Sequence, residues 1–150
     1  MPQKIDSFSG EYDWLSNFYP SKITMSDGLT YPSVEHAFQA HKTNVLSERK
    51  AFCSPSAPTP GKAKRMGRKL KLRNDWEQIK IAVMKEAVWR KFEDPQLREK
   101  LLATGDAKLI EGNHWNDRFW GVCKGVGKNH LGQILMEVRN KIREQNGHAV

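Results

Sequence analysis

Residues 31–42 read YPSVEHAFQAHK, and this stretch predicts a helix that packs on the core. Ser33 suits the N-cap position, because its hydroxyl can accept a hydrogen bond from a backbone amide of the first turn. Beyond it, side chains at i, i+3, i+4 and i+7 form one stripe, which we expect to face the core. They are Val34, Ala37, Phe38 and His41. The helix should therefore begin after Ser33 and pack through this stripe.

The same helix carries a second stripe of polar side chains. Glu35, Gln39 and Lys42 follow one another at i, i+4 and i+7, so they share a face about two turns long. An acid, an amide and a cation beside an apolar stripe are suited to line a pocket. The same spacing also fits an ordinary solvated face, and both interpretations stay open.

Downstream signals predict further helices. One helix opens at Asp75, where Gln78 three residues later completes a capping box. Asp94-Pro95 ends that helix and begins the next, because proline is well placed at the first helical position. A last helix runs from about residue 129 to residue 144, with apolar side chains at helical spacing on its inner face.

The remaining segments predict short strands and loops. Residues 5–31 are rich in aromatics and turn formers, which indicates a small sheet or hairpin. Residues 54–60 read SPSAPTP and predict a stiff surface loop, and residues 106–127 predict short strands or loops. We therefore expect a mostly helical α+β fold with a small sheet, forming a single domain over residues 1–150.

A twelve-residue segment, Lys62–Arg73, carries almost all of the excess positive charge. The chain has 25 Lys and Arg against 17 Asp and Glu, a formal net charge of +8 at pH 7. Seven residues of the segment are basic: Lys62, Lys64, Arg65, Arg68, Lys69, Lys71 and Arg73. Such a patch attracts phosphate, on nucleic acid or on a nucleotide-like molecule, and it also fits a solvated helix. Helix-spaced Ala63, Met66 and Leu70 predict that part of it docks on the core.

The composition excludes several classes of protein. No uncharged apolar run approaches the ~20 residues of a membrane-spanning helix, and the N-terminus lacks the apolar stretch of a signal peptide. Cys53 and Cys123 have no CxxC partner, which indicates free thiols in a reducing compartment. Glu35-His36 lacks the second histidine that a zinc-binding helix requires. We therefore expect a cytoplasmic protein that uses neither a metal nor another cofactor.

Residues 120–129 read WGVCKGVGKN and run glycine-rich into a helix start. Backbone amides freed by Gly125 and Gly127, two lysines and the helix dipole would together favour an anion. The segment matches neither a Walker loop nor the dinucleotide fingerprint. Two interpretations stay open: a phosphate cradle of another type, or a tight turn that uses glycine for its positive φ.

Residues 113–120 read NHWNDRFW and place Asp117 among aromatic side chains. These aromatics are suited to stack on a flat base, although they also fit a packed core. Glycoside cleavage usually employs two carboxylates, one that donates a proton and one that stabilises an oxocarbenium-like sugar. Glu35 and Asp117 are our candidate pair.

Together these segments resemble the NADAR superfamily, whose members are also called YbiA-like, from about residue 8 to residue 143. The matching segments are LSNFYP (15–20), YPSVEHAFQAHK (31–42), AKRMGR (63–68), NDW (74–76), LLATGD (101–106), NDRFWG (116–121) and GKNHLG (127–132). So many pieces in one order make the resemblance specific.

The resemblance implies an α+β fold and hydrolysis of the N-glycosidic bond between a ribose and a base. Members of the family act on phosphoribosylamino-pyrimidine intermediates of riboflavin synthesis, and others remove ADP-ribose from guanine in nucleotides or nucleic acid. By motif, the catalytic or essential positions correspond to Glu35, Trp76, Asp117 and Trp120. Lys42 follows in the same motif as Glu35, and some members use a lysine that captures the opened ribose as a Schiff base. Helical spacing instead predicts that Trp76 lies in the core. The core position and the functional role are compatible if that end of the helix borders the pocket.

We therefore expect a metal-free N-glycosidase that takes a ribosyl-phosphate or ADP-ribosyl small molecule, or ADP-ribosylated DNA or RNA. Glu35 would act as general acid and base, Asp117 would stabilise the cationic sugar or position water, and Trp120 would stack on the base. The expected substrate-binding residues are Asn17, Phe18, Gln39, Arg68, Gly127, Lys128 and Asn129. The alternative is a module that binds ADP-ribose or nucleic acid without turnover.

Overall fold

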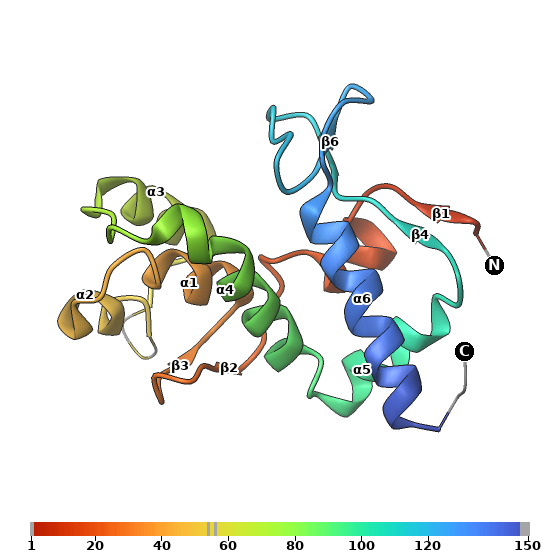
Figure 1. Cartoon of the computed structure of the whole chain (residues 1–150), viewed down its shortest axis with the longest axis horizontal. Helices are drawn as coiled ribbons and strands as arrows, with labels where there is room; N and C mark the ends of the chain where they lie inside the picture. Colours follow the sequence, from red (N-terminus) through yellow and green to blue (C-terminus); the bar gives the residue numbers. More distant parts are fainter. Residues whose placement is uncertain (1, 54, 56, 148–150) are drawn as a thin grey trace. The chain divides into compact units, whose positions relative to one another are not determined.

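The computed structural model of the chain describes residues 2–53, 55 and 57–147, and its fold is a mostly helical α+β arrangement, as expected (Figure 1). The chain divides into two compact units. The helical unit is Asn17–Lys91, and the terminal unit joins Met1–Ser16 to Phe92–Val150. A single domain over residues 1–150 stays a prediction. Among the described helices, none combines the length and the apolar character needed to cross a membrane.

The helical unit combines a β-hairpin with helices α1 to α4. The expected hairpin pairs β2 (Ile23–Thr24) antiparallel with β3 (Thr30–Tyr31). The helices are α1 (Val34–Ala40), α2 (Leu46–Lys50), α3 (Pro60–Lys69) and α4 (Trp76–Lys91). α1 packs against both α3 and α4, so it lies in the interior of this unit.

Helix α1 begins where the sequence predicts it. The Ser33 hydroxyl caps the helix by accepting the His36 amide at 3.2 Å. All residues of α1 are buried, not only those of the predicted apolar stripe. Glu35 and Gln39 are 8% and 4% exposed, so the interpretation of their stripe as a solvated face is wrong.

Some local features differ from the sequence-based expectation. A 3₁₀ helix, η1 (Gly10–Leu15), stands in a region where we expected strands. Helix α2 was not expected, because none of its residues is buried and it therefore has no apolar stripe. Pro60, expected in a loop, is the first residue of α3, since Thr59 caps that helix and proline suits its first position. Of the loop predicted at 54–60, residues 54 and 56 lie outside the described residues.

Helix α4 starts as predicted, although Asp75 is paired differently from a capping box. The carbonyl oxygen of Asp75 accepts the Gln78 amide at 3.0 Å. Its carboxylate accepts from the Arg73 guanidinium, with 2.6 Å between Nε and Oδ1. An ion pair at the helix start thus takes the place of the expected side-chain cap.

The terminal unit contains the other strands together with helices α5 and α6. Its strands pair in parallel, β1 (Lys4–Ile5) with β4 (Lys108–Leu109) and β5 (Gly112–Asn113) with β6 (Val122–Cys123). The Asp94 carboxylate caps α5 (Pro95–Ala103), and α6 (His130–Gln145) packs on α5 and β4. The apolar face of α6 is buried as expected, with Leu131, Ile134, Leu135, Val138 and Ile142. Both predicted helices of this unit are therefore confirmed.

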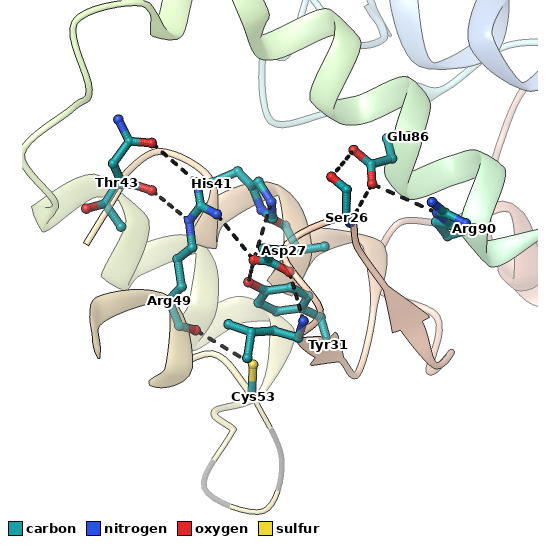
Figure 2. A network of polar contacts seen from close by, with 12 residues as sticks. Ser26, Asp27, Tyr31, His41, Thr43, Arg49, Cys53, Glu86 and Arg90 are labelled. Atoms are coloured by element: carbon teal, nitrogen blue, oxygen red, sulfur yellow. Dashed lines mark hydrogen bonds and ion pairs between the residues drawn. The ribbon is translucent and has the colours of Figure 1, made fainter. Parts of the chain in front are cut away.

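A buried carboxylate in the hairpin turn ties the hairpin to α1 and α2, as Figure 2 shows. The Asp27 side chain is 11% exposed. Its Oδ2 atom accepts from the Tyr31 hydroxyl at 2.7 Å and from Arg49 Nη1 at 3.3 Å, and it lies 3.6 Å from His41 Nε2. Burial and the Asp27 carboxylate raise the pKa of Tyr31, so the phenol remains a proton donor. Asp27 could not be recognised from the sequence, because an aspartate in a hairpin turn is usually a surface residue.

His36 fastens α1 to the segment before α3. Its Nε2 atom lies 2.6 Å from the Pro58 carbonyl oxygen, which can only accept, so Nε2 carries the proton. Its Nδ1 atom, 2.7 Å from the Ser33 hydroxyl, then accepts the hydroxyl proton. Burial lowers the pKa of His36, and the bond to Pro58 opposes this effect. The imidazole is therefore held neutral in the folded protein.

We expect the free energy of unfolding to decrease as the pH falls below about 6.5, and to decrease less in the His36→Gln variant. A histidine whose pKa is lower in the folded than in the unfolded state contributes its full stability above the unfolded value. That contribution is lost as the pH falls toward the folded value. Burial also lowers the pKa of His41, so the variant should keep part of the pH dependence. Urea unfolding above and below pH 6.5 measures the pH dependence of stability in the wild type and the variant. Identical pH dependence in the two proteins would show that His36 does not contribute to it.

Candidate functional site

The central polar pair of the helical unit is Glu35 with Gln39, one turn apart on α1. The Gln39 Nε2 group donates to Glu35 Oε2 at 2.7 Å. Both side chains are more than nine-tenths buried. The Glu35 amide also donates to the Asn17 carbonyl oxygen at 3.0 Å, which fixes the start of the helix. The predicted polar stripe therefore forms a buried, hydrogen-bonded acid–amide pair.

Lys42 lies just beyond the C-cap of α1 and is half-buried. Burial lowers the pKa of its amine. The Glu35 carboxylate opposes this shift, whereas the charges of Arg68, Lys64 and Lys80 add to it. An amine with a lowered pKa is more often neutral, which is the nucleophilic form. The stripe thus joins a carboxylate to a half-buried lysine whose pKa is lowered.

The cations near Lys42 come from two neighbouring helices. Lys64 and Arg68 are one turn apart on α3, and Lys80 is on α4. The prediction that part of the basic segment docks on the core is confirmed by Ala63, which is fully buried. Lys80 is not among the residues predicted from the sequence, although its spacing of four residues from Trp76 places both on one face of α4. Together these cations make the surroundings of Lys42 favourable for phosphate.

Trp76 is 5% exposed and packs in the core of the helical unit. Its ring lies 5.1 Å from the ring of Phe38 on α1, tilted by 58°. The core assignment from helical spacing is therefore confirmed. The functional role that the family resemblance implies for Trp76 stays a prediction.

Two of the expected substrate-binding residues, Asn17 and Phe18, precede α1 and differ in their surroundings. The Asn17 side chain lies 3.6 Å from Met84 Sδ, and its carbonyl oxygen accepts the Glu35 amide. Phe18 is 43% exposed. Asn17 therefore supports the backbone at Glu35, whereas the Phe18 ring is accessible to a ligand.

In the terminal unit, the Asp117 carboxylate is fixed by its own loop. Its Oδ1 atom accepts the amides of Phe119 and Trp120 at 3.1 and 2.9 Å. The Asn113 side chain holds the same loop, donating to the Asp117 carbonyl oxygen and accepting the Asp117 amide at 3.0 Å. Residue Asn116 between them adopts a left-handed conformation with φ 67°. The carboxylate is thus held in one orientation by backbone donors.

Trp120 belongs to an aromatic cluster at the start of α6. Its ring meets Phe119 edge-on at 4.8 Å and His130 at 6.2 Å. Lys128 Nζ lies 5.9 Å from the centre of the Phe119 ring. Trp120 is partly exposed, so both stacking on a base and packing fit its position.

At the end of the glycine-rich segment, the backbone amides that lead into α6 are already hydrogen-bonded. The amides of residues 128–131 donate to carbonyl oxygens of residues 118–121, at 2.8 to 3.3 Å. The Asn129 side chain bridges the Leu109 carbonyl oxygen and the Glu111 amide. Gly127 has φ 155°, and a Cβ atom there would lie 2.9 Å from Val122 Cα. The amides of residues 128–131 are therefore not available to a ligand, whereas the side chains of Lys124 and Lys128 are both exposed. A phosphate cradle at Gly125 and Gly127 stays a prediction.

Glu35 belongs to the helical unit and Asp117 to the terminal unit. Their action as one catalytic pair stays a prediction. Within the described ranges, no group of at least three His, Cys, Asp or Glu side chains is arranged to hold a metal ion.

Comparison with known proteins shows which family this chain resembles. The model of the NADAR domain matches residues 6–143. The N-glycosidase YbiA of Escherichia coli (strain K12) is 43% identical over 142 residues, which cover 91% of this chain and 85% of that protein. A riboflavin biosynthesis protein of Vibrio vulnificus (strain YJ016) is 41% identical over 138 residues, 89% of this chain and 36% of that protein. The NMR structure of E. coli YbiA matches with a TM-score of 0.84 at 39% identity, over 100% of this chain and 91% of that one.

Proposed function

Because this chain belongs to the NADAR family, we propose that it is an N-glycosidase, an enzyme that hydrolyses the C–N bond between a ribose and a nucleobase-like group. The observation that carries this proposal is the buried Glu35 carboxylate, held by Gln39 and close to a lysine of lowered pKa. Two of the matched relatives are named as an N-glycosidase and as a riboflavin biosynthesis protein. The substrate we favour is therefore a phosphorylated ribosylamino intermediate of riboflavin synthesis.

The reaction requires a proton for the leaving base and an oxygen atom for C1′ of the ribose. Glu35 supplies the proton as general acid and then accepts a proton from the attacking water as general base. The cations on α3 and α4, Arg68, Lys64 and Lys80, hold the phosphate of the substrate. The roles expected for Asp117, to stabilise the cationic sugar or position water, and for Trp120, to stack on the base, stay predictions.

A screen of product release by mass spectrometry tests this function. The protein is incubated with phosphoribosylamino-pyrimidines and, separately, with ADP-ribosylated guanine as nucleotide and as DNA. Release of a free base from either class is expected. Binding of these compounds without release of base from any of them would contradict the proposal and favour a module that binds without turnover.

The exposed cations of α3 support a polymeric substrate as the second candidate. Arg65, Arg68 and Lys69 lie on the surface of the helical unit and are suited to contact a nucleic-acid backbone. If the substrate is ADP-ribosylated DNA or RNA, base release from the polymer should fall steeply with added salt. Release from the nucleotide should change little under the same conditions.

The free thiols Cys53 and Cys123 fit the cytoplasm, where we place the reaction.

Lys42 is the residue we expect to form a covalent adduct with the sugar. The neutral amine attacks C1′ as the C1′–N bond breaks, and the base leaves with a proton from Glu35. The C1′–O4′ bond then breaks as a proton passes from Nζ to O4′, which leaves a protonated imine between Nζ and C1′. Water then hydrolyses the imine and regenerates the amine. Borohydride present during turnover should reduce it to a stable secondary amine, detected by intact-protein and peptide mass spectrometry.

The Lys42→Arg variant should abolish the adduct, whereas Lys50→Arg at the exposed end of α2 should leave it unchanged. An adduct of undiminished yield in Lys42→Arg would remove Lys42 from this step. Base release without any trapped adduct in the wild type would favour direct attack by water.

A further inference from the structure

Gly67 on α3 lies against the side chain of Gln39 on α1. A Cβ atom on Gly67 would overlap Gln39 Oε1 and lie 2.7 Å from Gln39 Cδ. Gly67 is fully inside α3, and its φ is not among the positive values that favour glycine. Glycine is an unfavourable residue within a helix, where alanine would be better. The backbone conformation therefore gives no reason for glycine here, and the close approach of Gln39 does.

The amide of Gln39 is satisfied on one side only. Its Nε2 group donates to Glu35 Oε2 at 2.7 Å. Its Oε1 atom is buried and has no hydrogen-bond partner among the described residues. A buried carbonyl oxygen without a donor destabilises the folded state. The arrangement thus favours the bond to Glu35 at the expense of stability, which is typical of a functional site.

We propose that Gly67 is a positioning residue for Glu35, acting through Gln39. The missing side chain at residue 67 leaves room for the Gln39 amide to lie against α3 and to direct Nε2 at Glu35 Oε2. The Gln39 amide then holds the carboxylate in one orientation. This inference rests on the proposed function in so far as it assigns Glu35 to catalysis.

The Gly67→Ala variant tests the proposal without altering Glu35 or Gln39. The added methyl meets the far end of a flexible side chain, so it should displace the amide and leave the fold intact. We expect kcat for base release to fall about tenfold or more, with KM changed less than about twofold, because orientation of the acid is lost and substrate contacts are kept. The thermal midpoint should stay unchanged or rise. Gly61→Ala on the same helix is the matched control, since a Cβ there would have ordinary contact with Arg65 only, at 3.9 Å.

Gln39→Met provides an independent variant of similar volume that lacks both amide atoms. It should lower kcat like Gly67→Ala. Its thermal midpoint should change little, because removal of the unpartnered oxygen offsets loss of the bond to Glu35. In the double variant, Gly67→Ala should have no further effect on kcat. If the double variant instead lowered kcat by the product of the two separate effects, Gly67 would not act through Gln39.

The side-chain amide resonance of Gln39 gives a readout that does not depend on activity. In the wild type this amide should exchange slowly and respond to Glu35→Gln. In Gly67→Ala it should shift and lose its protection, whereas in Gly61→Ala it should not. An unchanged Gln39 resonance in Gly67→Ala would overturn the inference. Loss of protection in a protein that releases no base would instead refute the proposed function and leave the positioning contact standing.

Discussion

The Glu35→Gln variant should keep the fold and lose at least about 100-fold in the rate of base release, the low end for a positioned acid–base group. The fold should survive because the new carboxamide has the same shape as the carboxylate. Its carbonyl oxygen can still accept from Gln39 Nε2, which lies 2.7 Å from Glu35 Oε2 in the native site. The activity should be lost because an amide cannot donate or accept the proton at neutral pH.

Initial rates of base release and the thermal midpoint together measure this effect. Glu99→Gln, an exposed carboxylate on α5, is the control and should behave like the wild type in both assays. Full activity in Glu35→Gln would remove Glu35 from the mechanism. Loss of activity together with loss of the folded state would show that the acid is structural.

The largest effect on stability should come from Asp27→Asn, which we expect to lower the free energy of unfolding by about 3 kcal/mol. The buried carboxylate accepts from the Tyr31 hydroxyl and from the Arg49 guanidinium, whose side chain is 13% exposed. An asparagine must either turn its NH₂ group toward these donors or lose the bond to the Leu29 amide. The Arg49 charge is then left buried without a counter-charge, which is the costly part of breaking such a pair.

Urea unfolding of wild type and variant at neutral pH measures this loss. Asp6→Asn is a suitable control, because Asp6 pairs with Lys4 where both side chains are more than half exposed, and such pairs contribute little. A change in Asp27→Asn as small as that of the control would show that Asp27 contributes little to holding the hairpin, α1 and α2 together.

The parts of the fold set by neighbouring residues could be predicted from the sequence. Ser33 and Asp94 cap helices where the sequence places them, since each cap depends on amides two or three residues away. Helix α2 could not be predicted, because it has no buried residue, and its Arg49 pairs with Asp27, which is 22 residues distant. Long-range contacts of this kind leave no periodic pattern in the sequence.

The candidate site likewise has features that could be predicted from the sequence and features that could not. The stripe of Glu35, Gln39 and Lys42 could be found from helical spacing, but its burial could not, because it depends on α3 and α4 covering both sides of α1. The pairing of the amides of residues 128–131, just before and at the start of α6, could not be predicted either. Their acceptors belong to residues 118–121, and only the folded loop brings these carbonyl oxygens to the helix start.

Helix α1 has seven residues, all of them covered by other parts of the protein. Isolated helices shorter than roughly 12–15 residues are marginal in water. This segment therefore cannot acquire its shape ahead of the helices that enclose it, and the acid–amide pair comes into existence in the same cooperative step as the hydrophobic core. A partly folded intermediate of this chain would be catalytically silent, so recovery of turnover after dilution from denaturant reports on complete folding of the helical unit.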